Sequence, residues 1–155
     1  MTQPTAEDYE WMRLALELAY LCPPSFGAFS VGAVIVDQNG AEISRGYSRE
    51  TDSHVHAEES ALAKLAPEDP RLKTATIYST LEPCSQRKSR PRTCTQLILA
   101  AGIPRVVLAW REPGPFVADS QGYELLTAAG VTVVEIPELA QQAQAPNTHL
   151  SPGVG

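Results

Sequence analysis

The chain has 155 residues, 43% hydrophobic and 19% charged, which suits a single folded domain and excludes a disordered or fibrous protein. Its formal net charge of −6 argues against a general nucleic-acid binder, which is usually basic. No apolar run approaches the roughly 18–20 residues that cross a bilayer, and the first residues do not resemble a secretory signal. We therefore expect a cytoplasmic protein with neither a membrane nor a nucleic-acid partner.

Four helices are predicted along the chain. Residues 5–21 have Thr5 as a capping residue, acidic residues in the first turn and Trp11, Leu14 and Leu18 at helical spacing. Two prolines after Cys22 end this helix, because proline cannot continue the hydrogen-bond ladder. The other three helices end at Pro67, Gly102 and Gly130 and are expected over 56–66, 94–101 and 122–129.

Five short apolar strands alternate with these helices. The first two form a hairpin around a turn at 38–40, and the strands are expected over 31–36, 42–48, 74–80, 105–110 and 131–136. Helices that alternate with buried strands must cover both faces of a sheet. We therefore expect an α/β fold, a three-layer α/β/α sandwich around a five-stranded mixed sheet. One domain should span residues 1–145, and 146–155, rich in proline, glycine and small polar residues, should be a disordered tail.

Two motifs carry the chemistry: "HVHAEES" at 54–60 and "TLEPCSQRKSRPRTC" at 80–94. His56 opens the second helix, Cys84 directly follows a strand, and Cys94 opens the third helix. One imidazole and two thiolates make a catalytic zinc set with an open fourth position, and a helix start lowers the pKa of a thiol. Glu58, two residues from His56, is placed to carry protons between a zinc-bound water and a substrate.

Each part of this pattern has a simpler explanation when it stands alone. A His-x-Glu in a helix is common, and cysteine is often only a core residue. The conjunction is much rarer, and His-x-Glu followed by Pro-Cys and a second cysteine is the signature of zinc deaminases. We therefore predict a Zn²⁺ cofactor.

The chain resembles the cytidine deaminase superfamily, and within it most closely the deaminase half of the bifunctional riboflavin-biosynthesis deaminase/reductases. The similarity covers residues 8–136 and lies in "HAEESAL", "TLEPCS", "CTQLILAAGIPRVVLA" and "EPGPFVADSQGYELLTAAGVTV". It implies a cytidine deaminase-like fold, with His56, Cys84 and Cys94 as zinc ligands and Glu58 as the proton carrier. It also implies a homodimer or homotetramer.

Three departures from the family pattern limit what carries over. Nine residues separate Cys84 from Cys94, whereas most members have Pro-Cys-x-x-Cys and the riboflavin-type loop is one residue shorter than here. Ala28 stands where the riboflavin-type enzymes have a substrate-binding asparagine. The chain also stops where the reductase domain would begin, so either a separate reductase or another pathway is expected.

The loop between the cysteines is basic in an otherwise acidic chain. Arg87, Lys88, Arg90 and Arg92 lie within six residues. Such a run is often only a solvated surface, but its position at the mouth of the predicted site favours an anion such as phosphate, which arginine binds well. Arg90 and Arg92 are therefore substrate-binding candidates, and Arg90 best matches the basic residue of the riboflavin-type loop.

Four other residues have two interpretations each. Phe29 is a third substrate-binding candidate, because it could stack on a flat base, although packing beside a strand is the commoner role. His54 is expected to be exposed or to face the substrate rather than a metal. Cys22 is expected to be packed, and Trp110 lies either in a cavity wall or in the core.

The sequence thus predicts a zinc-dependent hydrolytic deaminase that removes an exocyclic amino group from a pyrimidine-like ring. The favoured substrate is the phosphoribosylated diaminopyrimidine of riboflavin biosynthesis. A deaminase of a free base, nucleoside or nucleotide in salvage or secondary metabolism is the alternative, and a non-catalytic zinc-binding partner subunit is a further one.

Overall fold

The computed structural model describes residues 3–85, 90–111 and 122–148. Its five strands form one sheet in the order β2-β1-β3-β4-β5, in which β1 pairs antiparallel with β2 and β3, and β3, β4 and β5 run parallel. The predicted mixed sheet is therefore confirmed. The strands are β1 (Gly32–Val36), β2 (Glu42–Tyr47), β3 (Thr76–Leu81), β4 (Arg105–Trp110) and β5 (Thr132–Glu135).

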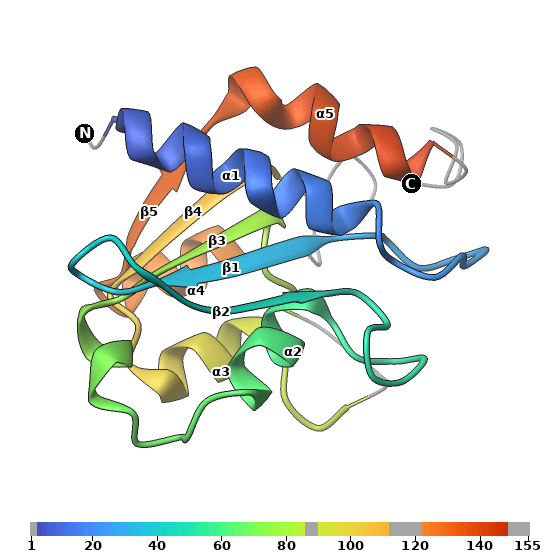
Figure 1. Cartoon of the computed structure of the whole chain (residues 1–155). Coiled ribbons are helices and arrows are strands. Elements are labelled where there is room, and N and C mark those ends of the chain that lie inside the picture. Colours follow the sequence, from blue (N-terminus) through green and yellow to red (C-terminus); the bar gives the residue numbers. More distant parts are fainter. Residues whose placement is uncertain (1–2, 86–89, 112–121, 149–155) are drawn as a thin grey trace.

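Helices cover both faces of this sheet (Figure 1). On one face lie α1 (Ala6–Ala19) and α5 (Ala140–Gln144); on the other lie α2 (Ala57–Ala63), α3 (Cys94–Ala101) and α4 (Gly122–Ala128). The expected three-layer sandwich is thus confirmed, with α5 as an element that the sequence did not predict. Short 3-10 turns complete the described chain at Pro70–Thr74, Pro137–Leu139 and Ala145–Asn147.

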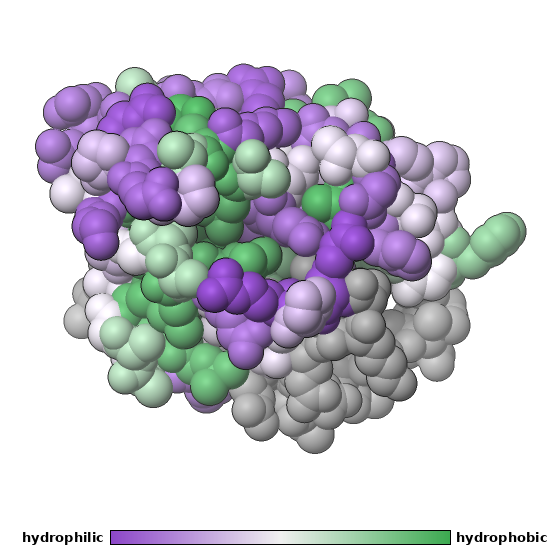
Figure 2. All heavy atoms as spheres, turned by 90° about the horizontal axis from the view of Figure 1, so that it is seen from below, coloured by the Kyte–Doolittle hydropathy of each residue, from purple (hydrophilic) through white to green (hydrophobic). Residues whose placement is uncertain are grey.

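The outer surface of the α2, α3 and α4 layer is mixed in character. Hydrophilic side chains cover much of its described part, with apolar ones in a band between them (Figure 2). This is the pattern of helices that turn one face to the sheet and the other to solvent. No helix in the described ranges is both long and apolar enough to span a bilayer.

The helix boundaries follow the local capping chemistry. Thr5 and Thr93 each form a reciprocal capping box with the third residue of α1 and α3, and Gly102 ends α3 in the left-handed conformation at φ 78°. Helices α1 and α2 end two and three residues earlier than predicted, at Ala19 and Ala63. Past both ends the chain continues in tighter turns, in which each main-chain N–H bonds to the carbonyl three residues earlier, so the layout is unchanged.

Alternating residues of the strands supply two cores, one on each face of the sheet. Val34 of β1 belongs to the core shared with α1 and α5, whereas its neighbour Ile35 belongs to the core on the opposite side, shared with α2, α3 and α4. Successive side chains of a strand point to opposite faces, so a wholly apolar strand such as β1 can serve both layers.

Gly46 allows α2 to lie directly on β2. A Cβ atom at this position would come within 2.6 Å of the main-chain oxygen of Ala57 and the main-chain nitrogen of Ala61. A side chain there would push α2 away from the sheet. Because α2 begins just after His56, this contact fixes the place from which the "HAE" motif starts.

The C-terminal segment is folded further than predicted. Asn147 is buried, and its Oδ1 accepts the main-chain N–H of Ser30 at 2.6 Å while its Nδ2 donates to the Ser30 carbonyl at 3.1 Å. The expected start of a tail at residue 146 is therefore at least two residues too early. Residues 149–155 lie outside the described ranges, so the tail itself stays a prediction.

Asp8 joins α1 to the sheet through a buried ionic network. Its carboxylate accepts hydrogen bonds from Tyr78 at 2.7 Å, from both terminal nitrogens of Arg105 at 2.9 and 2.7 Å, and from the Thr5 main chain at 2.9 Å. Burial alone raises the pKa of Asp8, but the hydrogen bonds from Arg105, Thr5 and Tyr78 outweigh it and lower this pKa from 3.8 to about 2.

We expect Asp8→Asn to lower the free energy of unfolding at pH 7 by about 2 kcal/mol. The ionised carboxylate of Asp8 has these partners only in the folded protein, and asparagine cannot replace its charge. A lowered pKa contributes stability above the unfolded value, so the contribution should disappear as the pH falls from about 4 to about 2. Urea unfolding of both proteins across this range measures it. Glu10→Gln, which removes an exposed carboxylate from the same helix, is the control; a difference that does not vary with pH would contradict the ionic origin.

Candidate active site

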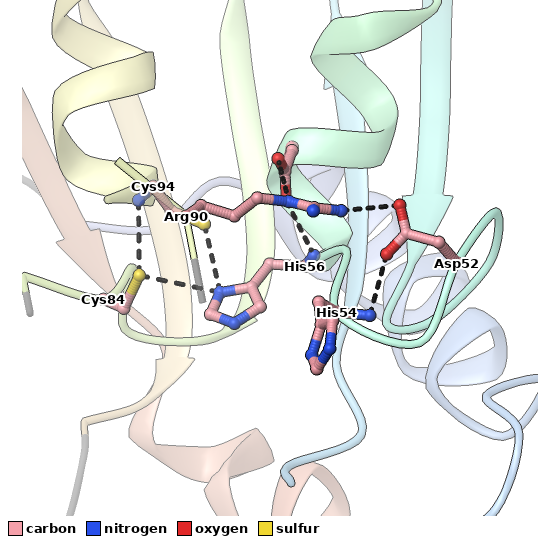
Figure 3. A network of polar contacts seen from close by, with 7 residues as sticks. Asp52, His54, His56, Cys84, Arg90 and Cys94 are labelled. Carbon is pink, nitrogen blue, oxygen red and sulfur yellow. Dashed lines mark hydrogen bonds and ion pairs between the residues drawn. The ribbon is translucent and has the colours of Figure 1, made fainter. Parts of the chain in front are cut away.

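His56, Cys84 and Cys94 converge at one edge of the sheet. Their ligand atoms all lie within 4.8 Å of one another, and they are the group of potential metal ligands found among the described residues. The Nδ1 atom of His56 lies 3.6 Å from Sγ of Cys84 and 3.4 Å from Sγ of Cys94 (Figure 3). The predicted ligands are thus brought together, with Nδ1 as the nitrogen that faces the two sulfurs.

The local structure explains how three distant residues meet. His56 is the N-cap of α2, Cys94 is the first residue of α3, and Cys84 follows the carboxyl end of β3. In an open α/β sheet the carboxyl ends of parallel strands and the starts of the following helices share one edge. The topology therefore gathers the two motifs.

The environment of Cys84 favours a thiolate. Its sulfur accepts the main-chain N–H of Cys94 at 3.2 Å, which is one of the unpaired donors at the start of α3. Hydrogen bonding with the Cys94 side chain, with further support from His56 and this N–H, lowers the pKa of Cys84 from 9.0 to about 4, although burial opposes the change. Cys84 is then ionised at neutral pH, as a metal ligand must be.

Glu58 lies beside this cluster as a buried carboxyl. Only 4% of the residue is exposed, and its Oε2 lies 3.0 Å from the hydroxyl of Ser79 on β3. Burial and the nearby charge of Cys84 raise the pKa of Glu58 above its ordinary value. A buried carboxyl with a raised pKa keeps a proton more readily than an exposed one, which suits it to proton transfer.

Ser79 is a site residue that sequence reasoning missed. Its hydroxyl also lies 2.8 Å from the Leu81 carbonyl, which can only accept a hydrogen bond. Because a hydroxyl has a single proton, Ser79 donates it either to this carbonyl or to Oε2 of Glu58. No local motif marks such a serine; only its place on the strand beneath α2 reveals it.

An open cavity of about 290 Å³ leads to the cluster. Its wall comes from the segment before β1, the end of β2, the turn before α2 and the end of β3, and includes Phe29, Arg49, His54, Glu58, Glu82 and Ser85. Phe29 meets Trp110 edge-to-face, with ring centroids 5.6 Å apart. Phe29 thus both lines the cavity and packs against the core, and Trp110 supports it from behind.

His54, Cys22 and Ala28 lie in or near the cavity wall. His54 is exposed and lines the cavity, outside the group of potential metal ligands, as expected. Cys22 is half-buried, with its sulfur 3.5 Å from the Val31 carbonyl, and it is packed as expected. Ala28 also lines the cavity, where it offers only a methyl group.

Two polar residues of the cavity wall were missed. Arg49, at a left-handed φ of 60°, donates to the carbonyls of Pro23 and Phe29 and to the Ser30 hydroxyl, all within 3.0 Å. It holds the segment before β1 in place. Glu82 is buried and accepts the main-chain N–H of Tyr123 at 2.8 Å, so it fixes the start of α4.

The two arginines that the sequence assigned to a phosphate have different surroundings. Arg90 is engaged with protein carboxylates, through Nη2 to Asp52 at 2.5 Å and through Nε to Glu59 at 3.2 Å. Arg92 is exposed. Arg87 and Lys88 lie outside the described residues.

Comparison with known proteins gives consistent results. Residues 5–110 match the model of the cytidine and deoxycytidylate deaminase zinc-binding region. Over 128 residues, or 81% of this chain and 31% of the relative, the chain is 47% identical to the diaminohydroxyphosphoribosylamino-pyrimidine deaminase of Schizosaccharomyces pombe. It thus spans about a third of the length of the curated relatives that it matches.

Solved structures agree in fold. RibD of Acinetobacter baumannii has a TM-score of 0.77 and 31% identity, with 92% of this chain and 38% of that chain covered. Rib2 deaminase of Aspergillus oryzae, solved in complex with DARIPP, has a TM-score of 0.72 and 26% identity, with 94% and 96% covered. The sequence and the fold together assign the chain to the cytidine and deoxycytidylate deaminase zinc-binding family.

Proposed function

We propose that this chain is a zinc-dependent hydrolytic deaminase acting on the phosphoribosylated diaminopyrimidine intermediate of riboflavin biosynthesis. The observation that carries this proposal is the 47% identity, over 81% of the chain, to a deaminase named for that substrate. The grouping of His56, Cys84 and Cys94 beside a buried Glu58 supports it, because the catalytic groups of the proposed reaction are then all present in this chain.

The donor set suits zinc. Two thiolates and one imidazole are ligands that zinc prefers, and three protein ligands leave a position for water or substrate. His56, Cys84 and Cys94 would hold the ion. A zinc ion bound there supplies a water whose pKa lies near neutrality.

Glu58 would manage the protons of the reaction. Its raised pKa suits it to take one proton from the attacking water and give it to a ring nitrogen, and then to carry the second proton of that water to the amino group, which leaves as ammonia. Ser79 would hold the carboxyl in place through the 3.0 Å contact with Oε2. Burial excludes bulk water, so the proton passes between Glu58 and the substrate rather than into solvent.

The cavity wall offers groups for both ends of such a substrate. Phe29, supported by Trp110, presents an aromatic face or edge to a flat ring. Arg92, an exposed residue of the basic loop, is the candidate for the phosphate. Arg90 contacts two protein carboxylates. The Aspergillus relative, solved with DARIPP, supports a pyrimidine substrate of this class.

A deaminase of a free base, nucleoside or nucleotide is the second candidate. Ala28 favours it, because the methyl group leaves the cavity without the amide that the riboflavin-type enzymes use at this position. A non-catalytic partner subunit would have no use for a buried carboxyl beside the three candidate zinc ligands. The homodimer or homotetramer stays a prediction, which light scattering can check.

Purified protein should contain one zinc per chain, and His56→Ala or Cys94→Ala should remove it. Loss of one ligand leaves two, which is too few for a zinc site. Elemental analysis measures the metal content, and circular dichroism checks that each variant has folded. Full zinc occupancy in a folded Cys94→Ala protein would contradict the assignment of the ligands.

Glu58→Gln should keep the fold and the zinc but lose activity by a factor on the order of 10²–10⁴, because glutamine has a similar volume and cannot carry the proton. Ammonia release from the phosphoribosylated pyrimidine measures kcat. Glu10→Gln is the matched control, since it makes the same change at an exposed position on the far face of the sheet. Near-normal turnover in zinc-loaded Glu58→Gln would remove Glu58 from the mechanism.

Ammonia release should be fastest with the phosphorylated diaminopyrimidine, compared with its dephosphorylated form, cytosine, guanine and dCMP. Arg92→Ala should lower kcat/KM about tenfold for the phosphorylated compound only, mainly through KM, and added salt should reduce the difference. Faster reaction of a free base would favour the second candidate. An equal loss on both forms of the pyrimidine would exclude a phosphate contact at Arg92.

A further inference from the structure

The side chain of Arg90 lies between two carboxylates rather than at the cavity. Its Nη2 is 2.5 Å from Oδ2 of Asp52, and its Nε is 3.2 Å from Oε2 of Glu59 (Figure 3). Asp52 lies in the turn before α2, and Glu59 lies in the first turn of α2. One guanidinium therefore connects the loop between the two cysteines with both sides of the "HVHAEES" motif.

Each of these carboxylates uses its other oxygen for a histidine. Oδ1 of Asp52 accepts the main-chain N–H of His54 at 2.8 Å, and Oε1 of Glu59 accepts the main-chain N–H of His56 at 3.2 Å. The chain of contacts thus runs from Arg90 through two acids to the backbone of both histidines. We name these three residues, Asp52, Glu59 and Arg90, the arginine bridge.

The arginine bridge adds a side-chain connection between α2 and the loop between the cysteines, beside the packing of α2 on the sheet and on α3. His56 is placed by α2, which packs on β2, whereas Cys84 and Cys94 bound the loop that contains Arg90. A guanidinium presents its donors in a fixed planar arrangement, so it sets the separation of two acceptors more tightly than a lysine could. The bridge therefore bears on the relative position of His56 and the two sulfurs.

The stability of the fold is a poor explanation for the arginine bridge. The exposed fractions of the side chains are 30% for Arg90, 49% for Asp52 and 21% for Glu59, and ion pairs exposed to this degree contribute little to folding. A metal site responds differently, since removing a group that orients a ligand typically costs roughly 10–100-fold in metal affinity.

We propose that Arg90 is a positioning residue for the metal centre. It fixes the backbone of His56 through Glu59, and it fixes the backbone of His54 through Asp52. This role rests on the zinc site of the proposed function but not on the identity of the substrate. It replaces a direct contact between Arg90 and a substrate phosphate. A phosphate that bound Arg90 through the same nitrogens would have to displace both acids.

The rate of zinc release to a chromophoric chelator tests this role without any substrate. Arg90→Ala should release zinc about tenfold faster than the unchanged protein. Arg90→Lys should fall between the two, because lysine keeps the charge but not the planar fork. Arg71→Ala is the matched control, since it removes an arginine from another exposed ion pair, with Asp69, outside the cavity wall, and its zinc release should be unchanged.

A double-mutant comparison separates a connected network from independent effects. Asp52→Asn keeps an oxygen for the N–H of His54 but loses the ion pair with Arg90. If the residues act together, Asp52→Asn combined with Arg90→Ala should release zinc no faster than Arg90→Ala alone. The thermal midpoint of the metal-free proteins should vary little, because exposed ion pairs add little stability. If Arg90→Ala does not fold, Arg90→Lys and Asp52→Asn provide the same comparison.

Three results would overturn the role. Zinc release from Arg90→Ala at the unchanged rate would do so, and so would strictly additive effects in the double variant. A rise in KM limited to the phosphorylated substrate, with zinc release unchanged, would identify Arg90 as a phosphate ligand instead. A protein that binds no zinc at all would contradict the proposed function together with this inference, so the two failures are distinguishable.

Discussion

The structure depends on bringing one imidazole and two thiols to the same point from three separate segments. Their ligand atoms lie within 4.8 Å of one another. Two starts of helices and one end of a strand meet there, and unpaired helix N–H groups favour the ionised sulfur of Cys84. The same close packing that gathers the ligands also buries Glu58, since α2 can approach β2 only where Gly46 has no side chain. The candidate metal ligands and the buried carboxyl therefore share one packing constraint.

Most of this arrangement could be predicted from the sequence because its determinants are local. Capping residues, glycines past helix ends and short β-branched runs mark the elements, and α3 and β4 have the predicted bounds. The site could be predicted for a related reason. The residue types that zinc requires are rare in this chain, and each stands at the boundary of a predicted element, where the topology of an α/β sheet places ligands.

The rest depends on contacts between distant residues, which leave no local pattern. Arg90 was assigned to a phosphate because its neighbours are basic, but its partners lie 38 and 31 residues away in the chain. Helix α5 was missed because its sequence, "AQQAQ", has no apolar periodicity and attaches to the sheet through few side chains, among them Ala143. Ser79 became a site residue only through its register on β3 beneath Glu58.

The hydrogen bonds between Asn147 and Ser30 have a practical consequence. The amide pairs with both main-chain groups of Ser30, as a neighbouring strand would, and Ser30 directly follows Phe29 in the cavity wall. A pull on the chain beyond residue 148 would therefore reach the cavity wall at Phe29 through one buried side chain. The start of α1 lies at the opposite end of that layer from the end of the described chain (Figure 1). An affinity tag or surface tether is thus better placed at the N-terminus, where it leaves this wall undisturbed.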